Sequence, residues 1–308
     1  LKGASVAEKR KDMRVKHGWL RTCSMEQPRG FLSVVGAILT EPCSPEADYG
    51  VFYIEARTYQ PMCGAGTLSV AKVLVETGMV KRVEPETKIV LETPTGLVTV
   101  YVKWENHMVA SINLGNVPAF LYRKELHIDL AGYGDVSVDI GYGGNFFVLA
   151  DVHSLGLTIT KDTVNLLRSL SKDILAAANK VIKVAHPTNP AINYLDQVLF
   201  CQNVPEEDGG YLAQCIFGDA QADISPCGTG TSTRLAQRYF RGLIGLEETF
   251  VQKSVCGGAF HAKGLRETTL GGVPAIVPYV SCSDVHITGF NHLIVEENDK
   301  LKNGFVSW

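Results

Sequence analysis

The sequence predicts an α/β protein of two pseudo-symmetric domains, each a curled, mostly antiparallel sheet around a central helix. Two observations lead to this prediction. The chain has 308 residues, more than one core usually holds and natural for two domains of about 150 residues each. The segments PMCGAGTLSVAKVLVETG and SPCGTGTSTRLAQRYFRG both contain Cys-Gly-x-Gly-Thr, and a glycine follows each cysteine after fifteen residues. We expect residues 1–120 with 288–308 to form one domain and 121–287 the other.

The order of elements in the first half recurs in the second. Alternating apolar residues around TPTG predict a hairpin over 87–104, and a second hairpin over 126–140 turns at Gly132 to Gly134. Apolar residues at helical spacing predict a long amphipathic helix from Thr160 to about Lys183. Further short apolar runs predict strands at 36–42, 50–56, 211–219, 250–264 and 274–282.

The helix after the first cysteine is apolar nearly all round. Its polar strip consists of Lys72 and Glu76. Such a helix is normally buried, so we expect it to run through the middle of its domain to Gly78. Because the motif is repeated, we expect the helix after the second cysteine to end near Gly242. We also expect each cysteine to lie at the N-terminus of its helix.

Composition excludes several classes of protein. The formal net charge of −3 offers no basic footprint for nucleic acid, and no apolar run approaches the ~20 residues that span a bilayer. We therefore expect a cytoplasmic protein that binds neither nucleic acid nor membrane. The chain starts at Leu1 rather than Met, and we expect residues to precede it. A homodimer is compatible with the sequence.

Eight cysteines occur, and none forms a Cys-x-x-Cys pair, so we expect reduced thiols and no metal site. Six of them are predicted to be small buried hydrophobes, at 23, 43, 201, 215, 256 and 282. The exceptions are Cys63 and Cys227, which head the two glycine-rich motifs.

A cysteine at a helix N-terminus suits acid–base chemistry. The unpaired N–H groups and the helix dipole favour a thiolate, and neighbouring glycines let backbone donors approach a bound carboxylate closely. If the two halves face each other, one thiol lies on each side of a small molecule. That arrangement predicts removal of a proton from one face of a carbon and its return to the other, without a metal or another cofactor.

Asp223 precedes Cys227 by four residues and could receive a substrate ammonium group, although a capping aspartate is an equal alternative. With the helix ends holding a carboxylate, the predicted ligand is an α-amino acid. Other motifs are weak: GTGTST lacks the lysine of a P-loop, and His286 and His292 are more simply loop or strand residues than metal ligands. The candidate catalytic residues are Cys63 and Cys227, and the candidate substrate-binding residues are Gly64, Ala65, Gly66, Asp223, Gly228 and Thr229.

At these residues the sequence resembles the proline racemase and 4-hydroxyproline 2-epimerase family, relatives of diaminopimelate epimerase. Further motifs carry the resemblance: QPRG at 27–30, GAILTEP at 36–42, NVPAF at 116–120, DIGYGGNF at 139–146, HPTNPAIN at 186–193 and HITGF at 286–290. The resemblance implies two similar α/β domains with diaminopimelate-epimerase-like folds. It also implies that Cys63 and Cys227 exchange base and acid roles, that Asp223 lies near the substrate nitrogen, and that Gly64, Gly228 and Thr229 contact the carboxylate.

Two departures from the family pattern bear on the activity. The family usually has histidine where this chain has Ala65, and its opening strand with an HTGG-like signature does not occur here. The leading hypothesis is a proline racemase or hydroxyproline epimerase. The alternatives are a trans-3-hydroxy-L-proline dehydratase, whose first cysteine is typically threonine, and a protein that binds a proline-like ligand without turnover because histidine is replaced by Ala65.

Overall fold

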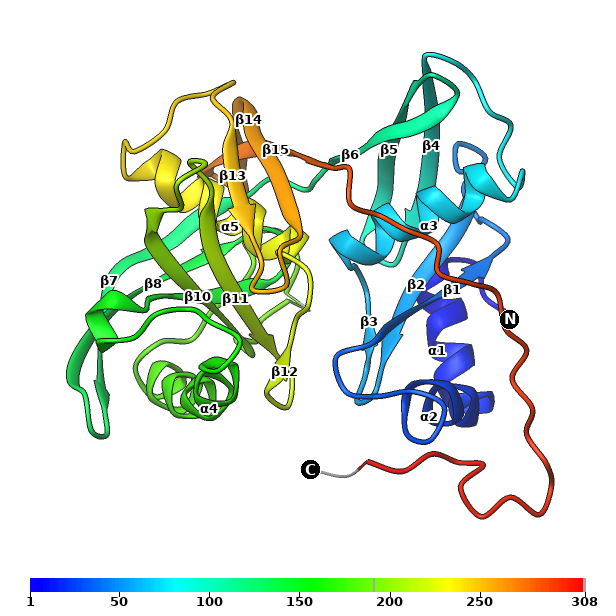
Figure 1. Cartoon of the computed structure of the whole chain (residues 1–308), viewed down its shortest axis with the longest axis horizontal. Helices are drawn as coiled ribbons and strands as arrows, with labels where there is room; N and C mark the ends of the chain where they lie inside the picture. Colours follow the sequence, from blue (N-terminus) through cyan, green and yellow to red (C-terminus); the bar gives the residue numbers. More distant parts are fainter. Residues whose placement is uncertain (191, 307–308) are drawn as a thin grey trace. The chain divides into compact units, whose positions relative to one another are not determined.

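The computed structural model describes residues 1–190 and 192–306, and the chain divides into two compact units. The first unit comprises Leu1–Leu114 with Ser283–Trp308, and the second comprises Gly115–Cys282. Each unit has strands and helices of its own, so the structure is of the mixed α/β class (Figure 1).

The strands of the first unit follow the order β1-β2-β4-β5-β6, with the short strand β3 paired to β2. Strands β2 and β4 are parallel, and the other neighbouring pairs are antiparallel. Helices α1 (Val6–Lys16) and α2 (Gly18–Met25) pack on β2. The strands are β1 Val35–Thr40, β2 Tyr49–Glu55, β3 Tyr59–Gln60, β4 Glu86–Thr93, β5 Gly96–Glu105 and β6 Met108–Gly115.

The sheet of the second unit has the order β15-β14-β13-β11-β10-β9-β8-β7, with β12 paired to β11. Its first and last strands meet, because Ala119, next to β7, forms a bridge with Ile276 of β15. The sheet is therefore curled. Its strands are β7 Phe120–Leu130, β8 Gly134–Tyr142, β9 Phe146–Asp151, β10 Gln197–Pro205, β11 Tyr211–Phe217, β12 Gln221–Ala222, β13 Phe250–Lys253, β14 Ala259–Leu270 and β15 Val273–Cys282.

The predicted repetition of elements is confirmed, and it extends over seven elements. In the first unit β1 and β2 pair antiparallel, β3 folds back on β2, helix α3 (Gly64–Glu76) follows, and β4 returns parallel to β2. In the second unit β10, β11, β12, α5 (Gly228–Phe240) and β13 do the same. Both copies continue with two antiparallel strands. One cysteine therefore precedes the crossover helix of each copy.

Both predicted hairpins form. Ile89 pairs with Val100 across the first, and Leu130 pairs with Gly134 across the second. The repeated glycines also have the same role, because Gly78 follows α3 with φ +73° and Gly242 follows α5 with φ +70°. Only glycine adopts this conformation without strain, so the fifteen-residue spacing marks the end of each helix.

The two repeated helices are both buried, but for different reasons. Helix α3 buries apolar residues and leaves Lys72 and Glu76 at its edge, where their charged groups pair at 3.0 Å. Helix α5 is buried from Gly228 to Ala236 although most of that segment is polar. Its hydroxyl groups bond to carbonyls one turn earlier, and Arg234, which is fully buried, donates to the carbonyls of Gln202 and Leu212. Hydrogen bonds thus replace apolar contacts for most of these polar groups, although Arg234 Nε has no hydrogen-bond partner within the described part of the chain.

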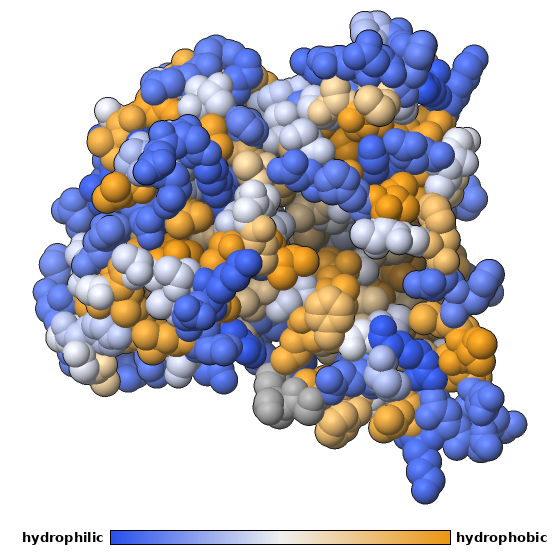
Figure 2. Space-filling model, viewed as in Figure 1, coloured by the Kyte–Doolittle hydropathy of each residue, from blue (hydrophilic) through white to orange (hydrophobic). Residues whose placement is uncertain are grey.

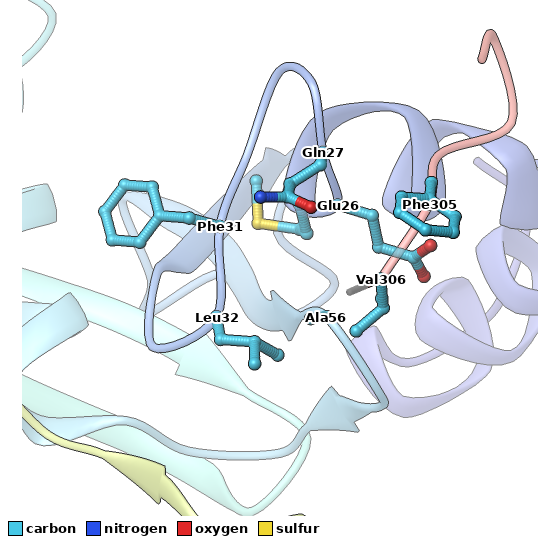
Figure 3. Close-up of a pocket in the computed structure, with 8 residues that line it drawn as sticks. Glu26, Gln27, Phe31, Leu32, Ala56, Phe305 and Val306 are labelled. Carbon is cyan, nitrogen blue, oxygen red and sulfur yellow. The ribbon is translucent and has the colours of Figure 1, made fainter. Parts of the chain in front are cut away.

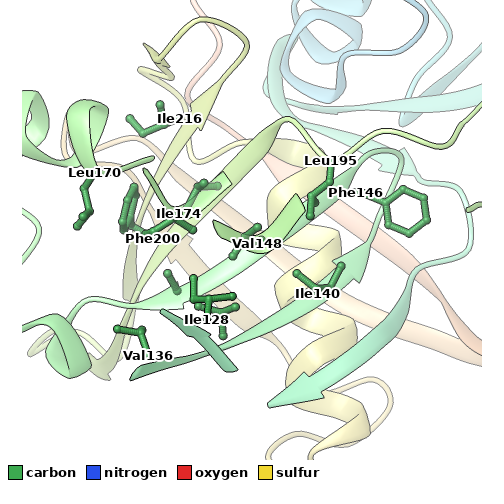
Figure 4. Packing of buried hydrophobic residues seen from close by; sticks show 14 of the residues in the cluster. Ile128, Val136, Ile140, Phe146, Val148, Leu170, Ile174, Leu195, Phe200 and Ile216 are labelled. Carbon is green, nitrogen blue, oxygen red and sulfur yellow. The ribbon is translucent and has the colours of Figure 1, made fainter. Parts of the chain in front are cut away.

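A long helix, α4 (Val164–Val181), covers the outer side of the second sheet. It begins four residues later than expected, because Thr160 and Thr163 hold a hydrogen-bonded turn before it. Figure 4 shows Leu170 and Ile174 of α4 pointing toward Phe200 of β10, within a large group of buried apolar side chains in this unit.

The surface mixes polar and apolar residues. Figure 2 shows hydrophilic side chains over much of the visible face, with hydrophobic groups between them. Among the described residues, no helix is both long enough and apolar enough to cross a membrane.

Candidate functional site

Cys63 caps the N-terminus of α3. Its Sγ accepts a hydrogen bond from the backbone N–H of Gly66 at 3.3 Å, and its carbonyl accepts one from the N–H of Thr67 at 2.9 Å. A side chain at this position satisfies one of the N–H groups that have no partner within the helix. The half-buried thiol therefore lies at the positive end of the helix dipole, which favours a negative charge there.

A buried tyrosine is linked to the same helix end through hydrogen bonds. The hydroxyl of Tyr53, on β2, lies 2.5 Å from Thr67 Oγ1, and Thr67 Oγ1 donates to the carbonyl of Cys63 at 2.7 Å. Burial raises the pKa of Tyr53, and negative charge at Cys63 raises it further, so the phenol stays protonated. Tyr53 and Thr67 fix the backbone that carries the first thiol.

Cys227 caps α5 in the same way. Its Sγ accepts from the N–H of Gly230 at 3.4 Å, and its own N–H donates to Ser225 Oγ at 3.1 Å. Unlike Cys63, Cys227 has a positive φ of 65°, a conformation that costs non-glycine residues about 1–3 kcal/mol and is concentrated at functional sites. The thiol is buried, with 6% of the residue exposed.

The second glycine of each Cys-Gly-x-Gly motif leaves room for the sulfur. A Cβ at Gly66 would lie 2.7 Å from a ring carbon of Tyr53 and 3.3 Å from Cys63 Sγ. A Cβ at Gly230 would lie 3.0 Å from Cys227 Sγ. Close packing around the thiols therefore favours glycine at both positions, most strongly at Gly66, where a Cβ could be placed only if a neighbour moved.

Asp223 and Cys227 lie together with a third residue, Cys215 of β11. The two sulfurs and a carboxylate oxygen of Asp223 are all within 4.8 Å of one another. A hydrogen bond to Cys227, together with burial, raises the pKa of Cys215 well above its ordinary value, so Cys215 keeps its proton. Burial also raises the pKa of Asp223, although hydrogen bonds from Ser225 and Cys227 oppose this effect.

The motifs NVPAF and DIGYGGNF meet at the first turn of α5. Asn116 donates to Ser232 Oγ at 2.8 Å and to the carbonyl of Gly143 at 3.1 Å. A Cβ at Gly143 would lie 2.6 Å from the carbonyl oxygen of Thr229, and one at Gly144 would lie 2.7 Å from the Thr229 side chain. Because this packing is so close, it fixes Thr229, whose hydroxyl lies 3.7 Å from Cys227 Sγ.

The predicted site residues form one group in each unit. Gly64, Ala65 and Gly66 make up the first turn of α3 after Cys63. Asp223, Cys227, Gly228 and Thr229 surround the first turn of α5. Sequence reasoning missed Tyr53, Asn116 and the contact of Cys215 with the site. Cys215 is buried as expected, whereas Cys43 and Cys256, which were also expected to be buried, are exposed. Cys215 could have been suspected from its place in the strand just before Asp223, since strand residues beside a candidate carboxylate can reach it.

A cavity of about 220 Å³ lies elsewhere in the first unit. Figure 3 shows Phe31 and Leu32 on one side and Phe305 and Val306 on the other. The backbones of Gln27 and Phe305 bond to each other at this cavity. None of the predicted site residues lines it, and its mainly apolar walls do not match an amino-acid ligand.

Fold and site together define a duplicated α/β protein in which each repeat presents a cysteine thiol at a helix N-terminus. The model of the proline racemase family matches residues 1–306, and the chain belongs to this family. This membership confirms the resemblance seen in the motifs.

Relatives within the family differ in activity. The chain is 37% identical over 306 residues to a proline racemase of Clostridioides difficile, covering 99% of this chain and 91% of that protein. It is 36% identical over 307 residues to a trans-3-hydroxy-L-proline dehydratase of Burkholderia cenocepacia, with the same coverage. Membership therefore leaves racemase, epimerase and dehydratase activities to be distinguished.

The fold also matches a solved structure. A hydroxyproline epimerase from Agrobacterium vitis, crystallised with bound trans-4-hydroxy-L-proline, superposes with a TM-score of 0.90 at 28% identity. The match covers 99% of this chain and 88% of that one. The expected fold class is confirmed.

Proposed function

We propose that this protein is a cofactor-independent racemase or epimerase that inverts the α-carbon of proline or a hydroxyproline. The observation that carries the proposal is the repeated cap: Cys63 and Cys227 each head a crossover helix, and each sulfur accepts the N–H of the glycine three residues on. Inversion by deprotonation and reprotonation needs one acid–base group on each face of the carbon.

Each candidate residue has a part in this reaction. One cysteine thiolate removes the α-proton, while the other thiol delivers a proton to the opposite face, and the roles exchange for the reverse direction. Asp223 receives the substrate nitrogen. The N–H groups of Gly64 and Gly228 and the hydroxyl of Thr229 hold the carboxylate, because helix N-termini bind anions.

The difficult step is stabilisation of the carbanion, since an amino-acid α-proton is weakly acidic. Fixed N–H dipoles aimed at the carboxylate stabilise the charge that develops there, and removing one such donor typically costs about 10²–10³-fold in rate. The close packing of Gly143 and Gly144 against Thr229 keeps the donors at the start of α5 in place before substrate arrives.

A substrate panel tests the proposal. The protein is incubated with L- and D-proline and with the cis and trans isomers of 3- and 4-hydroxyproline, and products are separated by chiral chromatography. We expect inversion at C2 for at least one of them. Binding by calorimetry without any product would instead select a protein that holds a proline-like ligand without turnover.

A dehydratase is the second candidate, favoured by the 36% identity to a trans-3-hydroxy-L-proline dehydratase. Such an enzyme removes the same α-proton and then expels the 3-hydroxyl group as water. Reduction of the trans-3-hydroxyproline reaction with borohydride would trap its ketimine as proline. The presence of cysteine at position 63, where dehydratases resembling this chain typically carry threonine, supports the isomerase.

A further inference from the structure

Cys215 has no part in the proposed reaction, yet it lies beside the second candidate thiol. The residue is 2% exposed, and its sulfur, Cys227 Sγ and an Asp223 oxygen are within 4.8 Å of one another. Among the described residues, this is the one group of three Cys, His, Asp or Glu side chains that lie close enough together to share a metal ion.

The separation fits a small thiophilic cation. Tetrahedral sulfur and oxygen ligands about 2.0–2.3 Å from Zn²⁺ lie about 3.3–3.8 Å from each other. The three atoms lie within 4.8 Å of one another, so their separations must shorten by at most about 1–1.5 Å to reach that spacing. Both cysteines are buried, whereas Asp223 is half-buried.

The charges of the bound state balance as well. Metal binding would release the protons of both thiols to solvent, because the thiolate is the form that binds a metal. Two thiolates and the Asp223 carboxylate then carry a charge of −3, against the +2 of the ion and the ~+0.5 of the N-terminus of α5.

We propose that Cys215, Asp223 and Cys227 form a binding site for a thiophilic divalent cation of the Zn²⁺ class. On binding, each thiol forms a sulfur–metal bond and its proton passes to solvent, while one position of the ion stays open to water. Occupation removes Cys227 from acid–base work, so the ion acts as an inhibitor. This last consequence rests on the proposed function, whereas the binding itself does not.

Cobalt(II) is the probe, because thiolate–Co²⁺ bonds absorb in the near ultraviolet with an intensity that reports the number of thiolates. The purified full chain, with a non-chelating reductant, is titrated with Co²⁺, and Zn²⁺ is then added to displace it. Cys215→Val is the test variant. Cys201→Val is the matched control, since Cys201 is equally buried on the adjacent strand but lies outside the cluster. Cys63→Ser tests for a contribution from the other repeat.

We expect the wild type to show the band of two thiolates, and Cys215→Val to show about half the intensity with an affinity at least about tenfold weaker. Cys201→Val and Cys63→Ser should match the wild type. Absence of a band in the wild type, equal binding by Cys215→Val, or loss of the band in Cys63→Ser would overturn the proposal. If circular dichroism shows that Cys215→Val is unfolded, Asp223→Asn, which lowers affinity but keeps both thiolates, provides the test.

Turnover supplies a separate readout. Zn²⁺ should inhibit the wild type at concentrations that leave Cys215→Val active. If no substrate is turned over at all, the proposed function fails while the cobalt result still decides whether the cation binds. If turnover occurs and the cobalt band is missing, the metal site alone is refuted.

Discussion

Replacing Gly66 by alanine would crowd the first candidate thiol. The new methyl group would lie 2.7 Å and 2.9 Å from two ring carbons of Tyr53 and 3.3 Å from Cys63 Sγ. Tyr53 is fully buried and its hydroxyl is tied to Thr67, so the ring cannot swing away. The strain must therefore move the first turn of α3 or the sulfur itself.

The size of the effect follows from two opposing contributions. Overpacking a buried site costs about 1–3 kcal/mol. Alanine in a helix gains about 1 kcal/mol over glycine. The free energy of unfolding should thus fall by about 0–2 kcal/mol, a modest loss. Activity should fall much further, because a displacement of about 1 Å at reacting groups costs about a hundredfold in rate.

Urea unfolding and the initial rate of inversion measure these two quantities. Gly230→Ala, which places a methyl group 3.0 Å from Cys227 Sγ, should behave like Gly66→Ala. Gly18→Ala is the matched control, since its methyl group would lie 3.7 Å from Tyr59 Oη at the start of another helix. The reasoning fails if Gly66→Ala keeps the wild-type rate within twofold, or if Gly18→Ala loses as much activity.

Three further predictions concern residues around the site. Asn116→Ala leaves Ser232 and the carbonyl of Gly143 without their donor, so the free energy of unfolding should fall by about 1–3 kcal/mol. Urea unfolding measures this loss, with Asn165→Ala, at an exposed position, as the control. Equal unfolding midpoints for the two variants would contradict the prediction. Burial alone would raise the pKa of Asp139, but hydrogen bonds from Arg241, Gln237 and the N–H of Glu125 outweigh it and hold this pKa below the ordinary 3.8. The ionised Asp139 therefore stabilises the fold above pH 3.8. This stabilisation is lost as the pH falls through the lower pKa of the folded state. Asp139→Asn should therefore flatten the acid limb of stability measured between about pH 2 and 5, and an unchanged limb would count against the assignment. Ala65→His should change the ratio of kcat/KM between proline and the hydroxyprolines in the substrate panel, whereas a uniform change across the panel would assign position 65 no part in specificity.

Much of the fold follows from local patterns in the sequence. The two hairpins, the amphipathic helix and the helix ends at Gly78 and Gly242 depend on turn residues and apolar spacing within a few residues, and the structure confirms them. The short strands β3 and β12 could not be predicted, because two residues are too few to show a pattern. The domain boundaries near residues 120 and 288 stay a prediction.

The burial of α5 could not be read from its sequence. Thr231, Ser232 and Arg234 are polar, and periodicity alone would place several of them at the surface. Arg234 is buried because its partners are carbonyls at positions 202 and 212, on strands that the chain reaches well before the helix. Such partners become known only when the strands are placed in space.

The candidate site, too, could be predicted only where it depends on neighbouring residues in the sequence. The Cys-Gly-x-Gly-Thr repeat identified both capping cysteines, since capping depends on the cysteine and the three residues after it. Cys215 was assigned to the core, because its contact with Asp223 and Cys227 depends on how β11 passes the start of α5. The roles of all these residues in catalysis stay predictions.

Deuterium incorporation tests the two-base account most directly. Each enantiomer of the preferred substrate is incubated in D₂O with the wild type, Cys63→Ser and Cys227→Ser, and both enantiomers are analysed by mass spectrometry at early times. The account predicts that the wild type forms product with one deuterium at C2 while the remaining substrate stays unlabelled, and that either substitution abolishes inversion. Inversion by either single variant at a rate near that of the wild type, or product without deuterium, would contradict it.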